Sequence, residues 1–133
     1  MLPLAGLHLL LAEDNELNSE IATALLEEQG ASITAVENGR LALEAIQNAA
    51  PRTYDVILMD VMMPEMNGLE ATRCIRAFEG KGPGEGTPII AMTANVFADD
   101  VKACLDAGMN SHVGKPLDMK VLIGEILKYT DAR

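Results

Sequence analysis

The stretch "VILMDVMMPEMNGLEA", residues 56–71, places an apolar run directly before an aspartate and a rigid turn. Asp60 ends the apolar run, Pro64 lies in the turn, and Asn67-Gly68 open the next regular segment. An aspartate at the end of a strand is by itself most often a turn residue or a helix cap. Asp60 has a chemical role only if other polar groups converge on it, so the rest of the chain decides its function.

Short apolar runs alternate with helical patterns along the whole chain. We predict five strands, at residues 8–12, 31–36, 55–59, 88–92 and 111–114. We predict five helices, at residues 16–30, 39–49, 68–78, 96–108 and 117–130. Strict alternation predicts a single α/β domain over residues 1–133, with a five-stranded parallel sheet that is doubly wound, (βα)5, in the flavodoxin-like strand order 2-1-3-4-5. Two segments fall outside the pattern: 1–6, a linker or an artificial start, and the Gly- and Pro-rich 79–88, a flexible loop.

Composition excludes several classes of protein. The 133 residues carry a net charge of −10, which repels phosphate backbones and anionic lipids, so we expect no direct nucleic-acid binding and no direct membrane insertion. Cys74 and Cys104 lack the spacing of metal ligands, which is typical of free thiols in a reducing compartment. We therefore expect a cytoplasmic protein, or the cytoplasmic part of a membrane-anchored sensor.

Polar side chains follow four of the predicted strands. Glu13-Asp14 follow the first strand, Asp60 the third, Thr93 the fourth and Lys115 the fifth. Each alone is explained as a helix cap or an exposed surface group. However, the carboxyl ends of parallel strands meet at one edge of the sheet, where open α/β sheets bind ligands. Together these residues predict a site at that edge.

The residue types at this edge indicate phosphoryl transfer. Three carboxylates crowded together are costly unless they are neutralised, and Lys115 supplies only one positive charge. Ligands that are all oxygen favour a hard divalent cation, Mg²⁺ by preference or Mn²⁺. With no glycine-rich phosphate loop, the nucleophile has to be a carboxylate, and Asp60 is central among these groups. Lys115 and the Thr93 hydroxyl would stabilise the oxygens of the transferred group.

Four pieces of the chain together resemble the receiver domain of two-component response regulators. They are "LLLAEDNELN", "DVILMDVMMPEMNGLEATRCIR", "PIIAMTAN" and "VGKP", which occur in the family's order and span about the whole chain. The phrases "AEDNELN", "MNGLEATR" and "AGMNSHVGKPLD" are most similar to receivers embedded in hybrid sensor histidine kinases. The resemblance implies a phosphorelay, with a histidine kinase or a histidine phosphotransfer domain as partner.

The resemblance also assigns roles to single residues. It implies Asp60 as the phosphoacceptor, Thr93 as the switch hydroxyl and Lys115 as the phosphate-binding lysine, and it implies that the Lys115–Pro116 bond is cis. It implies the following Mg²⁺ ligands: Asp14 and Asp60 directly, Glu13 through water, and the backbone carbonyl of Met62.

One position departs from the family pattern. The switch aromatic three residues before the lysine, usually Tyr or Phe, is His112, a side chain able to charge near neutral pH.

The family's moving surface would comprise the fourth helix (96–107), the fifth strand (111–114) and the last helix (117–130). The same surface could support a weak homodimer.

Several alternatives stay open at this point. A haloacid-dehalogenase-type phosphatase also uses a strand-end aspartate, but its general acid would fall on Met62, which cannot transfer a proton. A flavodoxin or dinucleotide-binding module would meet repulsion from Glu13-Asp14. The chain could also be a scaffold without phosphorylation, or a free-standing response regulator rather than part of a hybrid kinase. Whether it counts as an enzyme is equally open: the domain would catalyse its own phosphorylation and dephosphorylation, and the parent chain could be a histidine kinase.

Overall fold

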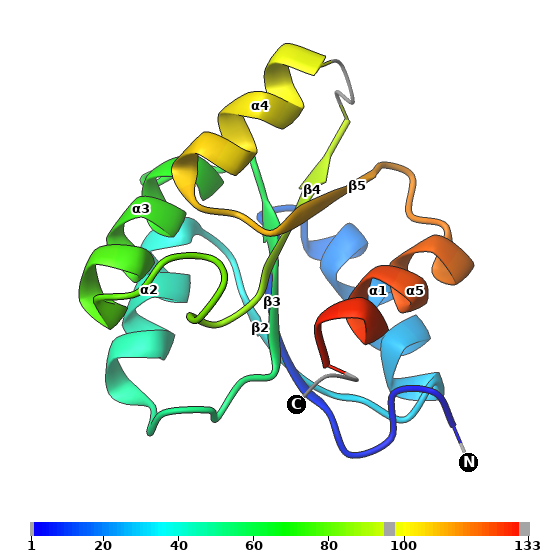
Figure 1. Cartoon of the computed structure of the whole chain (residues 1–133). Coiled ribbons are helices and arrows are strands. Elements are labelled where there is room, and N and C mark those ends of the chain that lie inside the picture. Colours follow the sequence, from blue (N-terminus) through cyan, green and yellow to red (C-terminus); the bar gives the residue numbers. More distant parts are fainter. Residues whose placement is uncertain (1, 95–97, 131–133) are drawn as a thin grey trace.

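Ten regular elements alternate strictly between strand and helix in the computed structural model, which describes residues 2–94 and 98–130 (Figure 1). The strands are β1 (His8–Ala12), β2 (Ser32–Val36), β3 (Val56–Asp60), β4 (Ile89–Thr93) and β5 (Ser111–Gly114). The helices are α1 (Glu16–Glu28), α2 (Gly39–Asn48), α3 (Gly68–Glu79), α4 (Ala98–Ala107) and α5 (Met119–Thr130). Each predicted strand and helix is present.

All five strands run parallel in the order β2-β1-β3-β4-β5, which confirms the predicted topology. Every residue of β3 and of β4 is buried, as befits central strands covered on both faces. The strand order reverses between β1 and β3. In sheets of this kind the crevice for ligands opens beyond the carboxyl ends of the strands at that reversal.

Helices cover both faces of the sheet. Helices α1 and α5 lie on one face, and α2, α3 and α4 lie on the other (Figure 1). Side chains along β3 point alternately to the two faces of the sheet. Val56 and Leu58 pack with α1 and α5, whereas Ile57 and Met59 pack on the opposite side. The core is therefore aliphatic on both faces of the sheet.

The structure shifts some predicted boundaries by one or two residues. Strands β3 and β4 each start and end one residue later than predicted, so Asp60 and Thr93 are the last residues of their strands. Helix α5 begins at Met119 instead of 117, because Asp118 Oδ1 accepts the Lys120 amide at 2.9 Å and caps the helix. The predicted start of the fourth helix at 96 lies outside the described residues.

The two segments that fell outside the predicted pattern both contact the domain. In the N-terminal segment, Leu4 is fully buried and its amide donates to the Gln29 carbonyl at 2.9 Å. Residues 80–88 form a loop without helix or strand, one residue shorter than the predicted 79–88 because Glu79 belongs to α3, and Arg76 and Glu79 of α3 bind Thr87 in it. Within the described ranges, no helix is both long enough and apolar enough to cross a bilayer.

Candidate functional site

The acidic pair Glu13-Asp14 directly follows β1 at the carboxyl edge of the sheet. The Glu13 amide donates to the Val36 carbonyl at 3.1 Å, which extends the pairing of β1 with β2. The helix cap is provided by Asn15, whose Oδ1 accepts the Asn18 amide at 2.9 Å. Glu13 Oε1 accepts the Asn15 amide at 3.1 Å, but Asn15 itself caps α1, so capping explains neither Asp14 nor the second oxygen of Glu13.

Asp60 ends β3 with only 6% of its surface exposed. Behind it the chain turns back, and the Gly68 amide donates to the Val61 carbonyl at 3.0 Å. A Cβ on Gly68 would overlap the Asp60 carbonyl oxygen, so only glycine allows this close approach. Asn67 then caps α3 by accepting the Glu70 amide at 2.9 Å. The turn that follows the strand therefore fixes the backbone of Asp60.

Helix α2 holds the other end of this turn. The Gly39 amide donates to the Met66 carbonyl at 2.9 Å, and a Cβ on Gly39 would overlap that same oxygen. Arg40 pairs with Glu65 at 2.9 Å, although both side chains are about half exposed. Glu65 itself has φ 64°, a conformation that costs free energy for a residue other than glycine. These contacts support the loop that carries Met62.

Lys115 joins the two acidic segments. Its Nζ lies 2.7 Å from Glu13 Oε2 and 3.1 Å from Asp60 Oδ2, and 23% of its side chain is exposed. The Lys115 amide donates to the Thr93 carbonyl at 2.9 Å, which continues the pairing of β4 with β5. The Lys115–Pro116 bond is cis, which confirms that prediction. Four of the predicted site residues, Glu13, Asp14, Asp60 and Lys115, are therefore brought together.

The three carboxylates could hold a metal ion. One oxygen from each of Glu13, Asp14 and Asp60 lies within 4.8 Å of the others, and Lys115 is the cation that pairs with Glu13 and Asp60. The donor set contains only oxygen, and Asp14 is exposed, so a bound ion would keep water ligands. Residues of this type fit Mg²⁺.

The surroundings shift the acidity of Asp60 and Lys115. Burial raises the pKa of Asp60, and the charge of Glu13 raises it further against the opposing hydrogen bond from Lys115. Burial lowers the pKa of Lys115, but its hydrogen bonds to Glu13 and Asp60 outweigh this, so that its pKa is raised overall. Lys115 is therefore charged at neutral pH, and the ionised Asp60 is costly until a further cation offsets it.

The remaining predicted residues lie around this centre. Thr93 ends β4 and is 7% exposed; it pairs in register with Gly114. Met62 is 76% exposed, and its amide lies 3.4 Å from Asp60 Oδ1, at the long end of hydrogen bonding. His112 lies on β5 opposite Ala91, half-buried.

Sequence reasoning placed Asn67-Gly68 at the start of a regular segment, but it did not identify the glycine contacts that position the site. The two Asn-Gly pairs, Asn38-Gly39 and Asn67-Gly68, each start a helix at the point where a helix cap and a close backbone contact coincide. The Asn-Gly dipeptide was the available signal, because it commonly marks a turn. What it could not reveal is that Gly39 contacts the segment before Gly68.

A groove of about 490 Å³ opens beside the acidic centre. It lies between α1, which contributes Ile21 and Leu25, and the segment Lys115 to Leu117. On the same helix Leu17 is 64% exposed and Ile21 is 50% exposed. The site is thus bordered by an apolar helix surface that solvent reaches.

Comparisons with known proteins agree with this geometry. The model of the family described as "Response regulator receiver domain" matches residues 9–127. The chain is similar to Probable histidine kinase 1 of Oryza sativa subsp. indica, with 41% identity across 84% of the chain and 14% of that protein. It is also similar to Sensor protein GacS of Pseudomonas syringae pv. syringae, with 39% identity across 91% of the chain and 13% of that protein. The chain therefore spans about one-seventh of the length of these curated relatives.

Solved structures show the same fold. The receiver domain of sensor histidine kinase PA1611 from Pseudomonas aeruginosa PAO1 has a magnesium ion coordinated in its active site cleft. It is 37% identical, with a TM-score of 0.82 over 96% of this chain and 99% of that one. The Saccharomyces cerevisiae receiver domain of Ssk1, crystallised with the histidine phosphotransfer protein Ypd1, is 27% identical. Its TM-score is 0.85 over 96% of this chain and 91% of that one.

Proposed function

The chain belongs to the family of response regulator receiver domains, and on that basis we propose that Asp60 accepts a phosphoryl group from a phosphohistidine in a two-component phosphorelay. The observation that carries this assignment is the position of the Asp60 carboxylate, 3.1 Å from Lys115 Nζ and in one cluster with Glu13 and Asp14. An aspartate that only capped a helix would need neither the lysine nor the acidic pair.

The proposed reaction uses the geometry of the site directly. An Asp60 carboxylate oxygen attacks phosphorus, an acyl–phosphate bond forms, and the bond from phosphorus to the histidine nitrogen breaks. The released imidazole keeps the electron pair of that bond. Lys115 is placed to bind one oxygen of the transferred group, and Thr93 at the end of the neighbouring strand is assigned a second. Water later cleaves the acyl phosphate and restores Asp60.

Asp14 and Asp60 would hold Mg²⁺ directly, together with the Met62 carbonyl, and Glu13 would hold it through water. When bound, the ion neutralises charge on the transferring oxygens. The observation that supports this role is the chemistry of the donor set: carboxylate oxygens within 4.8 Å of one another, with one ammonium group among them. The magnesium in the active site cleft of the PA1611 receiver adds support.

The partner is proposed to be a helix that presents a phosphohistidine, from a histidine kinase or a histidine phosphotransfer domain. Ile21 of α1 lines the groove beside the site, and it is exposed together with Leu17 on the same helix, so the two offer such a helix an apolar contact. The complex of Ypd1 with the Ssk1 receiver is a precedent for pairing of this type. A weak homodimer through α4, β5 and α5 is a separate proposal.

We assign the domain to a longer, hybrid sensor kinase that acts in the cytoplasm, because the curated relatives are histidine kinases of which it matches a small part. The unpaired thiols Cys74 and Cys104 are consistent with a reducing compartment. A free-standing response regulator is the alternative. The phosphatase alternative is disfavoured, since its general acid would be Met62, a thioether exposed to solvent.

Incubation with acetyl phosphate and Mg²⁺ tests the assignment. The intact mass is expected to rise by one phosphoryl group, and peptide mapping is expected to place it on Asp60. Asp60→Asn should abolish the gain, whereas Asp106→Asn, an exposed acid on α4, should leave it unchanged. Phosphorylation that persists in Asp60→Asn, or that is absent from the parent protein, contradicts the proposal.

A further inference from the structure

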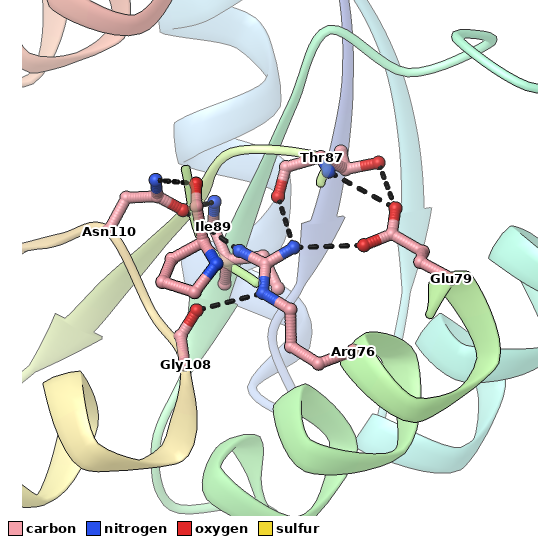
Figure 2. Close-up of polar contacts among 7 residues, drawn as sticks. Arg76, Glu79, Thr87, Ile89, Gly108 and Asn110 are labelled. Carbon is pink, nitrogen blue, oxygen red and sulfur yellow. Dashed lines mark hydrogen bonds and ion pairs between the residues drawn. The ribbon is translucent and has the colours of Figure 1, made fainter. Parts of the chain in front are cut away.

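Arg76 on α3 is a buried charge at the end of the sheet opposite Asp60. Its side chain is only 9% exposed, and Figure 2 shows its guanidinium group at the centre of a polar cluster. The cluster lies where β4 begins at Ile89 and where the turn after α4 leads into β5. The phosphoryl chemistry proposed for Asp60 does not use these residues.

The guanidinium group of Arg76 donates four hydrogen bonds to separate parts of the chain (Figure 2). Nε donates to the Gly108 carbonyl at 2.9 Å, and Nη2 donates to Asn110 Oδ1 at 2.9 Å. Nη1 donates to the Thr87 carbonyl at 2.8 Å and to Glu79 Oε1 at 2.9 Å. One side chain thereby connects α3 to the ends of three other segments.

Asn110 extends the cluster to β4 and to α5. Its Oδ1 also accepts the Ile89 amide at 2.9 Å, at the first residue of β4. Its own carbonyl accepts the Tyr129 hydroxyl of α5 at 3.0 Å. Its Nδ2 donates to the Pro83 carbonyl at 2.6 Å, in the Gly- and Pro-rich loop. The elements α4, β5 and α5, expected to move on phosphorylation, are therefore tied to α3 at this point.

Two glycines make room for Arg76. A Cβ on Gly108 would come within 2.9 Å of Arg76 Cγ, and Gly108 has φ +109°, a value that L side chains rarely adopt. A Cβ on Gly86 would overlap the ion pair between Arg76 and Glu79. The Gly-rich loop thus closes tightly over the guanidinium group.

Burying this charge is costly. Burial lowers the pKa of the guanidinium group, and the hydrogen bond and charge of Glu79 only oppose that shift. A buried ion pair is weak evidence for stability, and well-packed apolar residues often replace one without loss. What apolar residues could not provide is simultaneous hydrogen bonding to the Gly108 and Thr87 carbonyls and to Asn110. The arrangement therefore favours a single geometry of these segments.

We propose that Arg76 is a positioning residue for the switch surface: it pins the C-terminal end of α4 and the start of β5 to α3. Phosphorylation at Asp60 would then pivot α4 about Gly108. Strand β4 runs from the Arg76 cluster at Ile89 to Thr93, the residue assigned as the switch. Helix α4 returns from the Thr93 end of the sheet to Gly108, so it is held at one end and displaced at the other. This inference rests on the proposed function of Asp60.

The test compares the parent protein with Arg76→Gln, Arg76→Lys and the control Arg73→Gln, which changes an exposed arginine on the same helix. Beryllofluoride with Mg²⁺ serves as the probe, because it occupies an aspartate site as a phosphoryl mimic. Three quantities are measured for each protein: beryllofluoride affinity, amide hydrogen exchange over residues 104–112 with and without the probe, and thermal stability. Arg76→Lys keeps the positive charge but cannot reproduce the planar, forked set of N–H donors of the guanidinium group. It therefore tests the proposal if Arg76→Gln does not fold.

We expect Arg76→Gln and Arg76→Lys to bind beryllofluoride within about twofold of the parent, because the cluster lies away from Asp60. Exchange over 104–112 should rise by about tenfold without the probe, as loss of about 1.4 kcal/mol of local stability predicts. The difference that beryllofluoride causes in that segment should shrink, whereas Arg73→Gln should match the parent. Lower thermal stability with an unchanged beryllofluoride response over 104–112 would show that Arg76 is only structural. A parent protein that fails to bind beryllofluoride would instead overturn the function proposed for Asp60.

Discussion

The ammonium nitrogen of Lys115 lies 3.1 Å from Asp60 Oδ2, although 55 residues separate the two in the sequence. The same nitrogen lies 2.7 Å from Glu13 Oε2. The carboxyl ends of three strands of the parallel sheet, β1, β3 and β5, bring these groups to one point. One positive charge is therefore shared between two carboxylates, which leaves a net negative site that a divalent cation would complete.

Replacing Lys115 by methionine should separate phosphoryl transfer from metal binding. The variant keeps a long side chain but removes the charge that stabilises an oxygen of the transferred group. We expect phosphorylation by acetyl phosphate to slow by about 100- to 1,000-fold, the usual effect of losing one preorganised electrostatic contact. Mg²⁺ affinity, measured by titration, should stay equal or increase, because a competing cation has gone.

The matched control for this change is Lys120→Met, which removes an exposed lysine from α5. It alters the net charge by the same amount without touching the site, so its phosphorylation rate should equal that of the parent. A Lys115→Met variant that is phosphorylated at the parent rate would exclude Lys115 from the reaction.

Asp14→Asn should remove most of the Mg²⁺ affinity while the fold is kept. Asp14 is exposed, so the substitution leaves no buried group without a partner. We expect affinity to fall by at least about tenfold, since even changes outside the direct ligand set reach that size. Glu16→Gln is the control: it removes one exposed negative charge nearby, on the first turn of α1. Equal affinity losses in the two variants would indicate general charge attraction in place of coordination.

Gly68→Ala should destabilise the domain and disturb the site together. An added Cβ would overlap the Asp60 carbonyl oxygen, so the turn has to shift, and such overpacking costs about 1–3 kcal/mol. Thermal unfolding would measure the loss. In the control Gly124→Ala, the new methyl group enters open space on helix α5, where alanine should stabilise by about 0.5–1 kcal/mol. Similar stability of both variants would contradict the packing around Gly68.

The fold was predictable because strands that are buried on both faces of a sheet have a recognisable apolar sequence pattern. Strands β1, β3 and β4 are continuous apolar runs, and the helices between them show the spacing of one buried face. The predicted ends of β3 and β4 were one residue too early, because a polar residue at each end still pairs with the neighbouring strand. Asp60 pairs with Met92 in register, yet its carboxylate suggested that the strand ended one residue earlier.

The contacts that support the site were less accessible to sequence reasoning. The topology of a parallel sheet alone brings the residues at the carboxyl ends of its strands together. The convergence of Glu13, Asp60 and Lys115 could therefore be predicted. The contact of Gly39 with Met66 depends on how α2 and α3 pack, and no local pattern specifies it. Arg76 had a weak signal: it stands four residues after Thr72 and next to Ile75, on the buried stripe of α3. A charge on that stripe requires partners, but the sequence does not say which.

Glu125 should make the stability of the domain depend on acidity. Burial raises the pKa of Glu125, but the hydrogen bonds from Ser111 and Lys128 outweigh this and lower it overall. A lowered pKa in the folded state means that the contribution is present above the unfolded pKa of about 4.3 and is lost as the pH falls through the folded value. Since Lys128 is 60% exposed, solvent screens the pair and the contribution should be small.

Denaturant unfolding between about pH 3 and 7 would measure this contribution. Glu125→Gln should flatten the fall in the free energy of unfolding on acidification, and the control Glu27→Gln, an exposed acid on α1, should not. A variant with the same acid dependence as the parent would show that Ser111 and Lys128 do not hold the carboxylate in solution.

Thr93 and His112 should connect phosphorylation to the switch surface. Thr93 pairs with Gly114, and His112 pairs with Ala91 two residues earlier on the adjacent strands. Side chains alternate along a strand, so Thr93 and His112 project on the same face of the sheet as Ala91, which packs on the side of α2 and α3. A Thr93 hydroxyl drawn toward the phosphoryl group vacates space on that face, and His112 is placed to fill it.

NMR of the protein with and without beryllofluoride and Mg²⁺ would follow this coupling. Thr93→Ala should still bind the probe at Asp60, but the shift changes in residues 98–114 should shrink, because the hydroxyl that moves is gone. His112→Tyr restores the aromatic usual at this position and should keep those changes. A two-state switch predicts that the parent populates some active conformer before phosphorylation. Parent spectra whose changes stay around Asp60, with none in residues 98–114, would remove the coupling, and so would a Thr93→Ala variant that responds as the parent does.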